Sequence, residues 1–217
     1  MINGIQLKIC GLTTVADAVA ATAIGADFLG FILYPKSPRY LSLDAYASLS
    51  SSLPVGPRRV AVMVEPSSAE LAEIATFGFD FFQIHYPTSI SAETIADWSA
   101  QVGPQRLWLA PKLPPTDDLP VEVLPLADTF LMDTFHAASF GGSGKTGDWQ
   151  KFSCHQKAFP QKTWILAGGL SPENLAEAVS RSGTVFVDVN SGVETAPGVK
   201  DHAKLKRLAM ALAGLRS

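Results

Sequence analysis

The chain has 217 residues, of which 47% are hydrophobic and 17% charged, and its formal net charge at pH 7 is −3. This length suffices for one α/β domain with a full core, so we expect a single domain over residues 1–217. The charge excludes the basic surface of a nucleic-acid-binding protein. No apolar run approaches the roughly 20 residues of a membrane-spanning helix.

The cysteines and the N-terminus argue against a disulfide-stabilised, metal-binding or secreted protein. Two cysteines, Cys10 and Cys154, are too few for a disulfide framework, and no Cys/His cluster has the spacing of a metal site. The first residues lack the charged and long apolar regions of a secretory signal, so the cytoplasm is the expected compartment. The sequence carries no signal for oligomeric state.

Short apolar runs alternate with helical patterns along the whole chain. Eight runs predict buried strands, at residues 7–10, 28–33, 59–64, 80–85, 107–110, 130–133, 164–167 and 184–189. Helices are predicted between them, beginning at Thr13 or Thr14, Ser42 or Asp44, Pro66 or Ser67, Ser91, Asp148, Ser171, and Gly198 or Val199. Residues 111–120 form a proline-rich loop, and residues 121–126 a short or irregular helix.

This alternation predicts a parallel sheet. Eight repeats in a domain of near-minimal size favour a closed (β/α)8 barrel, the TIM barrel. The alternative is an open doubly wound sheet, which would carry a nucleotide fingerprint after its first strand. The segment after that strand, Cys10-Gly11-Leu12-Thr13, is not such a fingerprint.

One glycine-rich segment, Gly141 to Thr146, ends like a nucleotide-binding P-loop. The P-loop pattern requires a glycine five positions before Gly144, where this chain has Ser139. We therefore interpret residues 139–147 as a flexible lid or substrate loop.

The last two predicted strands each end in small residues. Gly168 and Gly169 follow the first, and Asn190, Ser191 and Gly192 follow the second. Neighbouring strand ends that expose backbone amides make a phosphate cradle, and phosphate usually binds at these two loops in a TIM barrel. The alternative is that both are simple turns.

Titratable residues also stand at strand ends, where the active sites of such barrels lie. Cys10, Asp133 and Asp188 are the main candidates, and His85 is a weaker one. A thiolate and a carboxylic acid suit paired proton transfer, and the thiol would need a lowered pKa, to which Lys8 or the substrate could contribute. Alternatively Cys10 is a small buried hydrophobe, Asp133 caps a turn and His85 belongs to the core.

Two further residues, Asp188 and Arg39, have both a structural and a ligand-binding interpretation. A carboxylate inside an apolar strand, as at Asp188, needs a partner or a ligand. Arg39 lies in a loop with two prolines, Tyr34 to Tyr40, which could hold its guanidinium toward an anionic substrate, or it is a solvated loop cation.

Several segments together resemble phosphoribosylanthranilate isomerases. They are KICGLT (8–13), GADFLGFILYPKSPRYLS (25–42), FLMDT (130–134), GGSGKTGDW (141–149), LAGGLSPENLAEA (166–178) and VDVNSGVETAPGVKD (187–201). The resemblance implies an isomerase of tryptophan biosynthesis without a cofactor, acting on a phosphosugar. It would convert N-(5-phosphoribosyl)anthranilate into the 1-deoxyribulose 5-phosphate by an Amadori rearrangement.

The resemblance also implies roles for the candidate residues. Cys10 would be the general base and Asp133 the general acid. Arg39 would lie near the anthranilate carboxylate and Asp188 near the ribose. The phosphate would bind at the loops that contain Gly168, Gly169, Ser191 and Gly192.

The chain departs from the family pattern twice. Tyr86 replaces a glycine after the fourth strand, so the loop there should differ, and Asn190 stands where serine is common. Ribulose-phosphate epimerases and indoleglycerol-phosphate synthases would need other strand-end residues. A catalytically silent phosphosugar-binding barrel is the rival from another class.

Overall fold

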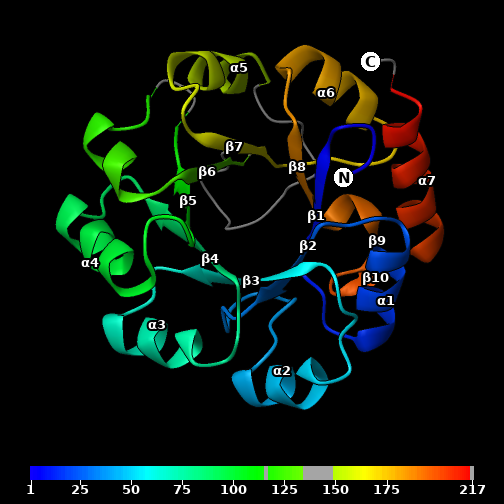
Figure 1. The fold of residues 1–217 in the computed structure, drawn as a ribbon, viewed down its shortest axis with the longest axis horizontal. Helices are drawn as coiled ribbons and strands as arrows, with labels where there is room; N and C mark the ends of the chain where they lie inside the picture. Colours follow the sequence, from blue (N-terminus) through cyan, green and yellow to red (C-terminus); the bar gives the residue numbers. More distant parts are fainter. Residues whose placement is uncertain (115–116, 134–148, 216–217) are drawn as a thin grey trace.

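A computed structural model describes residues 1–114, 117–133 and 149–215 of the chain. Eight parallel strands close into a barrel in which each pairs with the next and β8 pairs with β1 (Figure 1). They are β1 (Gln6–Ile9), β2 (Phe28–Ile32), β3 (Arg58–Val64), β4 (Phe81–Pro87), β5 (Leu107–Lys112), β6 (Thr129–Met132), β7 (Thr163–Leu166) and β8 (Phe186–Val189). The predicted TIM barrel is confirmed.

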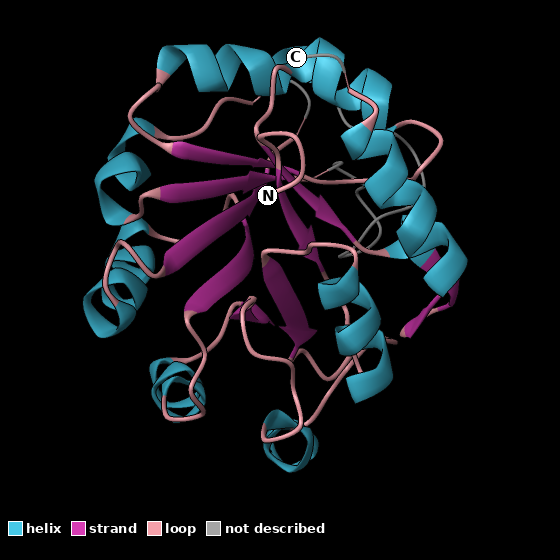
Figure 2. Ribbon diagram, turned by 45° about the vertical axis from the view of Figure 1, so that its right-hand side comes forward, coloured by secondary structure: helices cyan, strands magenta, loops and turns pink. Residues whose placement is uncertain are grey.

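Helices surround the strands on the outside (Figure 2). They are α1 (Val15–Ala23), α2 (Leu43–Ser50), α3 (Ser68–Ala75), α4 (Ala92–Val102), α5 (Trp149–Ala158), α6 (Leu175–Ser182), α7 (His202–Ala213) and the 3-10 helices η1 (Val121–Leu126) and η2 (Ser191–Val193). Four begin at predicted caps, because the hydroxyls of Thr14, Ser42, Ser67 and Ser91 each accept a backbone N–H of the first turn. Among the described helices, none has the length and apolar character to cross a membrane.

The interior of the barrel is closed by aromatic rings at one level. Phe28, Phe81, Trp108 and Phe186 come from four different strands. Their ring centroids lie 4.9 to 5.8 Å apart in five pairs. Face and edge contacts of this kind add to the stabilisation from burial alone. We call these four rings the aromatic floor.

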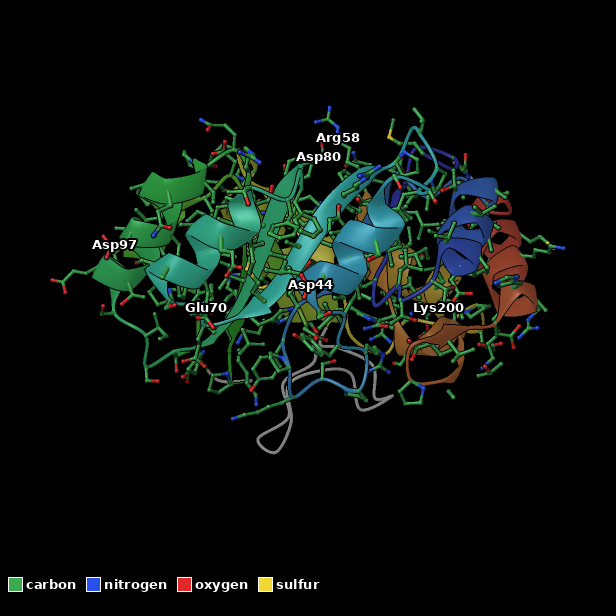
Figure 3. The ribbon with its side chains drawn as sticks, turned by 90° about the horizontal axis from the view of Figure 1, so that it is seen from below. Asp44, Arg58, Glu70, Asp80, Asp97 and Lys200 are labelled. Atoms are coloured by element: carbon green, nitrogen blue, oxygen red, sulfur yellow. The ribbon has the colours of Figure 1, made fainter. Side chains whose placement is uncertain are left out.

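The aromatic floor lies toward the N-terminal ends of the strands. Arg58, the first residue of β3, has its guanidinium carbon 5.7 Å from the centroid of the Phe81 ring. Figure 3 shows Arg58 and Asp80 at that end of the barrel, whereas Lys200 lies toward the other end. Ligands therefore have their space at the C-terminal ends of the strands, as the fold predicts.

The end of the chain differs from the sequence-based expectation. The last helix was expected from Gly198 or Val199, but a short antiparallel hairpin of β9 (Glu194–Ala196) and β10 (Val199–Lys200) precedes it. The helix begins at His202, because the Asp201 carboxylate accepts the amides of Ala203 and Lys204 at 2.9 and 3.0 Å.

Helix α6 also begins later than expected. It begins at Leu175 rather than directly after Ser171. The side chain of Asn174 accepts the amide of Ser171 at 2.9 Å and donates to the carbonyl of Gly169 at 2.8 Å. These two bonds connect Asn174 to the loop after β7. Ser171 still begins a hydrogen-bonded turn ahead of the helix, because its hydroxyl accepts the amide of Glu173 at 3.3 Å and its carbonyl accepts the amide of Leu175 at 3.0 Å.

Tyr86 continues strand β4 rather than altering a loop. It is 3% exposed and its ring meets that of Trp98 in α4 edge-on, with centroids 6.0 Å apart. Because side chains alternate along a strand, Tyr86 points outward while His85 faces the interior. Where a different loop was expected, strand β4 is therefore longer, and Tyr86 packs outside the site.

Candidate active site

A cavity that is open to solvent occupies the C-terminal end of the barrel. It is lined by seven of the eight residues predicted for the site: Cys10, Arg39, Asp133, Gly168, Gly169, Asp188 and Ser191. The eighth, Gly192, is not among the lining residues. The glycine-rich segment 139–147 and Asp148 lie outside the described residues.

Gly192 instead joins the two predicted phosphate loops. A Cβ atom on this residue would lie 2.0 Å from the carbonyl oxygen of Leu170. Only a residue without a side chain permits this contact between the loops after β7 and β8. Gly168 and Gly169 both have positive φ, at 90° and 66°. The two loops are thus neighbours, and their small residues are needed for the backbone geometry.

Lys8, Cys10 and Asp188 form a buried cluster at the bottom of this cavity. Lys8 is fully buried and donates to the Oδ2 atom of Asp188 at 2.9 Å. The register pairs these two residues directly across β1 and β8. A Cβ on Gly30 would lie 3.0 Å from both the Cys10 sulfur and the Lys8 Cε, so the thiol and the lysine share one small space.

The electrostatics of this cluster bear on the predicted proton transfer. A general base needs a lowered thiol pKa, but in the ligand-free protein burial raises the pKa of Cys10 above its usual value, although attraction to Lys8 opposes that rise. Burial disfavours the charge on Lys8, yet attraction to Asp188 and the hydrogen bond with it favour that charge, and the pKa of the ammonium is raised. The ligand-free site therefore holds a neutral thiol beside a charged lysine.

The second oxygen of Asp188 has a different environment. The Oδ1 atom is buried and has no hydrogen-bond partner among the described residues. A buried carboxylate oxygen without a donor is unfavourable unless a ligand supplies one. Since Asp188 lines the cavity, a ligand hydroxyl is a fitting donor.

Asp133 follows β6 directly and lines the same cavity, half-buried. It continues the inward-facing series of Thr129 and Leu131, because alternate residues of a strand face the same side. Cys10 occupies the matching position just after β1. Two titratable groups on different strands thus face one space.

His85 and Gln83 make a neutral polar pair on β4. The side-chain amide of Gln83 donates a hydrogen bond to Nε2 of His85, with the two nitrogens 2.7 Å apart. Burial, with a smaller contribution from the positive charge of Lys8, lowers the pKa of His85 from 6.5 to about 4. His85 lines the cavity as an uncharged ring at neutral pH.

We expect this shift to make folding stability depend on pH. Between pH 6.5 and about 4 the unfolded chain protonates His85 while the folded chain does not, so the free energy of unfolding falls as pH drops through this window. His85→Gln keeps an acceptor for Gln83 but cannot titrate. Urea unfolding at both ends of the window should show the stability difference, wild type minus variant, decreasing by roughly 2 kcal/mol toward low pH. If the free energies of unfolding of the two proteins changed equally with pH, the lowered pKa of His85 would be contradicted.

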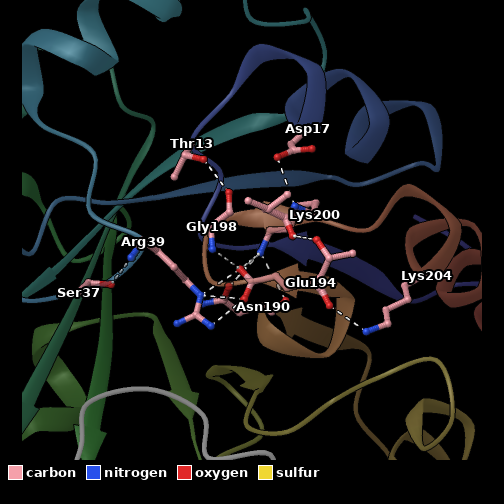
Figure 4. Close-up of polar contacts among 11 residues, drawn as sticks. Thr13, Asp17, Ser37, Arg39, Asn190, Glu194, Gly198, Lys200 and Lys204 are labelled. Atoms are coloured by element: carbon pink, nitrogen blue, oxygen red, sulfur yellow. Dashed lines mark hydrogen bonds and ion pairs between the residues drawn. The ribbon is translucent and has the colours of Figure 1, made fainter.

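Arg39 reaches the cavity from the loop after β2. Its Nε and Nη2 atoms donate to both carboxylate oxygens of Glu194, at 2.7 to 3.1 Å (Figure 4). Glu194 is also bound by Lys200, whose Nζ lies 2.8 Å from Oε1. Arg39 is therefore held by a partner and is not a freely solvated cation.

A family model described as N-(5'phosphoribosyl)anthranilate (PRA) isomerase matches residues 7–211 of the chain. The chain belongs to this family. The N-(5'-phosphoribosyl)anthranilate isomerase of Cereibacter sphaeroides is 40% identical over 208 residues, which cover 93% of this chain and 95% of that protein.

Solved structures of the family have the same fold. Phosphoribosyl anthranilate isomerase from Thermus thermophilus superposes with a TM-score of 0.81 at 30% identity, covering 98% of this chain and all of that one. Another phosphoribosyl anthranilate isomerase, solved in complex with reduced 1-(o-carboxyphenylamino)-1-deoxyribulose 5-phosphate, gives 0.76 at 29% identity, covering 97% and 100%. The predicted isomerase of tryptophan biosynthesis is thus confirmed at the level of the family.

Sequence reasoning about this phosphoribosylanthranilate isomerase family member did not single out three side chains that contact the predicted site. Glu194, Lys200 and Asn174 were not singled out, although their contacts order Arg39 and the two glycine loops. A buried lysine and glutamate near strand ends are the signal that could have drawn attention to two of them. No group of three potential metal ligands occurs within residues 1–114, 117–133 and 149–215.

Proposed function

We propose that this isomerase converts N-(5-phosphoribosyl)anthranilate into 1-(2-carboxyphenylamino)-1-deoxyribulose 5-phosphate. The observation that carries the proposal is the single cavity lined by Cys10, Asp133 and Arg39 together with the two glycine loops. These groups match the two anionic ends of the substrate and the two proton transfers between them. We further infer that residues 1–217 act as one domain.

Binding begins with the two anions. The phosphate occupies the loops after β7 and β8, where Gly168, Gly169 and Ser191 line the cavity. The anthranilate carboxylate lies near the guanidinium of Arg39, and a ribose hydroxyl donates to the free Oδ1 atom of Asp188. The sugar carbons then lie between the two anchors.

The first step opens the ring. Asp133, as a carboxylic acid, gives its proton to the furanose oxygen while the C1–O bond breaks and the nitrogen lone pair forms an iminium. The aspartate becomes a carboxylate and the substrate carries a positive charge. Half-burial of Asp133 allows it to be reprotonated from solvent after turnover.

The second step moves the proton from C2. The thiolate of Cys10 takes it, and the C–H electrons form a double bond to C1 that neutralises the iminium, giving an enolamine which tautomerises to the ketone. Cys10 is a thiol in the free enzyme, so it must first lose its proton to solvent, through the open cavity that it lines, when the complex forms. Lys8 favours the thiolate, and the cationic iminium adds to this attraction.

The direct test generates phosphoribosylanthranilate in situ and follows its conversion to the ketose by purified protein, with Asp133→Asn as the control. Conversion by the wild type alone supports the proposed reaction. A folded protein that binds the reduced product but converts nothing would instead identify a catalytically silent phosphosugar-binding barrel.

The raised pKa of Cys10 has a test of its own. Cys154→Ala leaves Cys10 as the only thiol of the chain. In this variant, alkylation by iodoacetamide, followed by mass spectrometry, should still accelerate as the pH rises past 9.0, because the thiolate is the reactive form and burial raises the pKa of the Cys10 thiol. A rate that levels off below pH 9.0 would contradict the neutral thiol in the ligand-free site.

A further inference from the structure

We infer that Glu194 is a positioning residue that holds Arg39 for the substrate carboxylate and fixes it relative to the phosphate loop. This inference rests on the proposed function and deepens it. It starts from an unusual placement: a carboxylate whose side chain is 4% exposed lies beside the residue expected to bind an anion. A carboxylate there would repel the anionic substrate unless neighbouring cations neutralised its charge.

The geometry leaves one edge of the guanidinium available. Glu194 receives Nε at 3.0 Å and Nη2 at 2.7 Å, a side-on pair. A guanidinium has five N–H donors in a rigid fork. Nη1 has no hydrogen-bond partner among the described residues, so the Nη1–Nη2 edge can receive a second carboxylate. Arg39 also lines the cavity, although its side chain is only 15% exposed.

Two cations keep Glu194 ionised. Burial would raise the pKa of this carboxyl, but hydrogen bonds from Arg39 and attraction to Lys200 outweigh it and lower the pKa. The amide of Gly198 also donates to Oε1, at 3.2 Å. Two positive charges on one carboxylate leave the group with a net positive charge, so it still attracts an anion.

The same carboxylate connects both anion sites. Glu194 directly follows η2, the turn that contains Ser191 and Gly192 of the phosphate loop. Lys200 continues the connection, because its Nζ donates to the Oδ1 atom of Asn190 at 2.9 Å. Figure 4 shows these side chains converging from the hairpin and the loops after β2 and β8. Arg39 and the phosphate loop are thus held at a fixed separation, which suits a substrate with an anion at each end.

A pair of ligands separates positioning from general structural support. One is the reduced product with its 2-carboxyphenyl group, and the other is the same molecule with an unsubstituted phenyl ring. Calorimetry on wild type and Glu194→Gln should show about a 10-fold or greater loss of affinity for the first ligand, equal to about 1.4 kcal/mol or more. Affinity for the second ligand should change by less than about 3-fold, since it never contacts Arg39.

Two further variants complete the experiment. Glu177→Gln makes the same chemical change at an exposed ion pair with Arg181 on α6, and it should alter neither affinity. Glu194→Asp keeps the charge but shortens the reach, so it folds more readily and should weaken the carboxylated ligand alone, by less than Glu194→Gln. In turnover, both Glu194 variants should raise KM more than they lower kcat.

The outcomes distinguish the two proposals. Equal weakening of both ligands by Glu194→Gln or Glu194→Asp would show a structural role and overturn the inference while leaving the proposed function standing. Unchanged affinity for both ligands would overturn it as well. A wild type that binds neither ligand and converts no substrate would overturn the proposed function, and the inference with it.

Discussion

Cys10→Ala is expected to lower kcat by about 10²- to 10⁴-fold, the usual contribution of a general base. Among the described residues no second cysteine lines the cavity. In the variant, water would therefore have to remove the proton from C2. The variant should remain folded, because alanine fits where a small buried thiol was. Kinetics with substrate generated in situ give kcat, and calorimetry with the reduced product shows whether the site is intact.

The second cysteine provides the matched control for this experiment. Cys154 lies in α5, is exposed and does not line the cavity. Cys154→Ala should leave kcat and KM unchanged. If Cys10→Ala kept more than about half of the wild-type kcat, Cys10 would not be the base and the neutral thiol would be a packing residue.

Asp133→Asn is expected to lower kcat by a similar factor, again about 10²- to 10⁴-fold. The amide has nearly the shape of the carboxylic acid but cannot give a proton to the ring oxygen, so the furanose stays closed. Binding of the reduced product, whose ring is already open, should change little. This combination of a lost kcat with retained binding is the signature of a group that acts in the transition state.

Strand β6 supplies a matched control at its other end. Asp128 directly precedes β6, is exposed, and lies 3.5 Å from Lys162. Asp128→Asn makes the same change outside the cavity and should leave turnover unaffected. Equal loss of activity in both variants would indicate damage to the strand rather than removal of an acid. Full activity in Asp133→Asn would remove Asp133 from the mechanism.

The strands and their ends could be predicted because they depend on local patterns. Alternation along β1 and β6 determines that Cys10 and Asp133 face the interior once the barrel closes. The pairing of Arg39 with Glu194 could not be predicted in this way, because 155 residues separate them. Likewise the raised pKa of Cys10 depends on burial, which no local pattern reports.

The C-terminal hairpin was missed for a different reason. Its two strands have three and two residues, too short for a periodicity to be recognised, and Gly198 between them resembles the start of a helix. The start of α6 was placed a few residues too early, because Asn174 also bonds back to residues 169 and 171, although Ser171 makes the expected cap bonds. Both errors lie beside the cavity, where side-chain contacts override local propensity.

The aromatic floor lies at the end of the barrel opposite the opening of the cavity. The rings of Phe28, Phe81, Trp108 and Phe186 pack against one another inside the barrel, and the cavity opens to solvent at the C-terminal end. The product of the proposed reaction must therefore leave through the opening by which the substrate enters. Product that is still bound blocks the entry of the next substrate, so product and substrate compete for the same opening as well as for the same site.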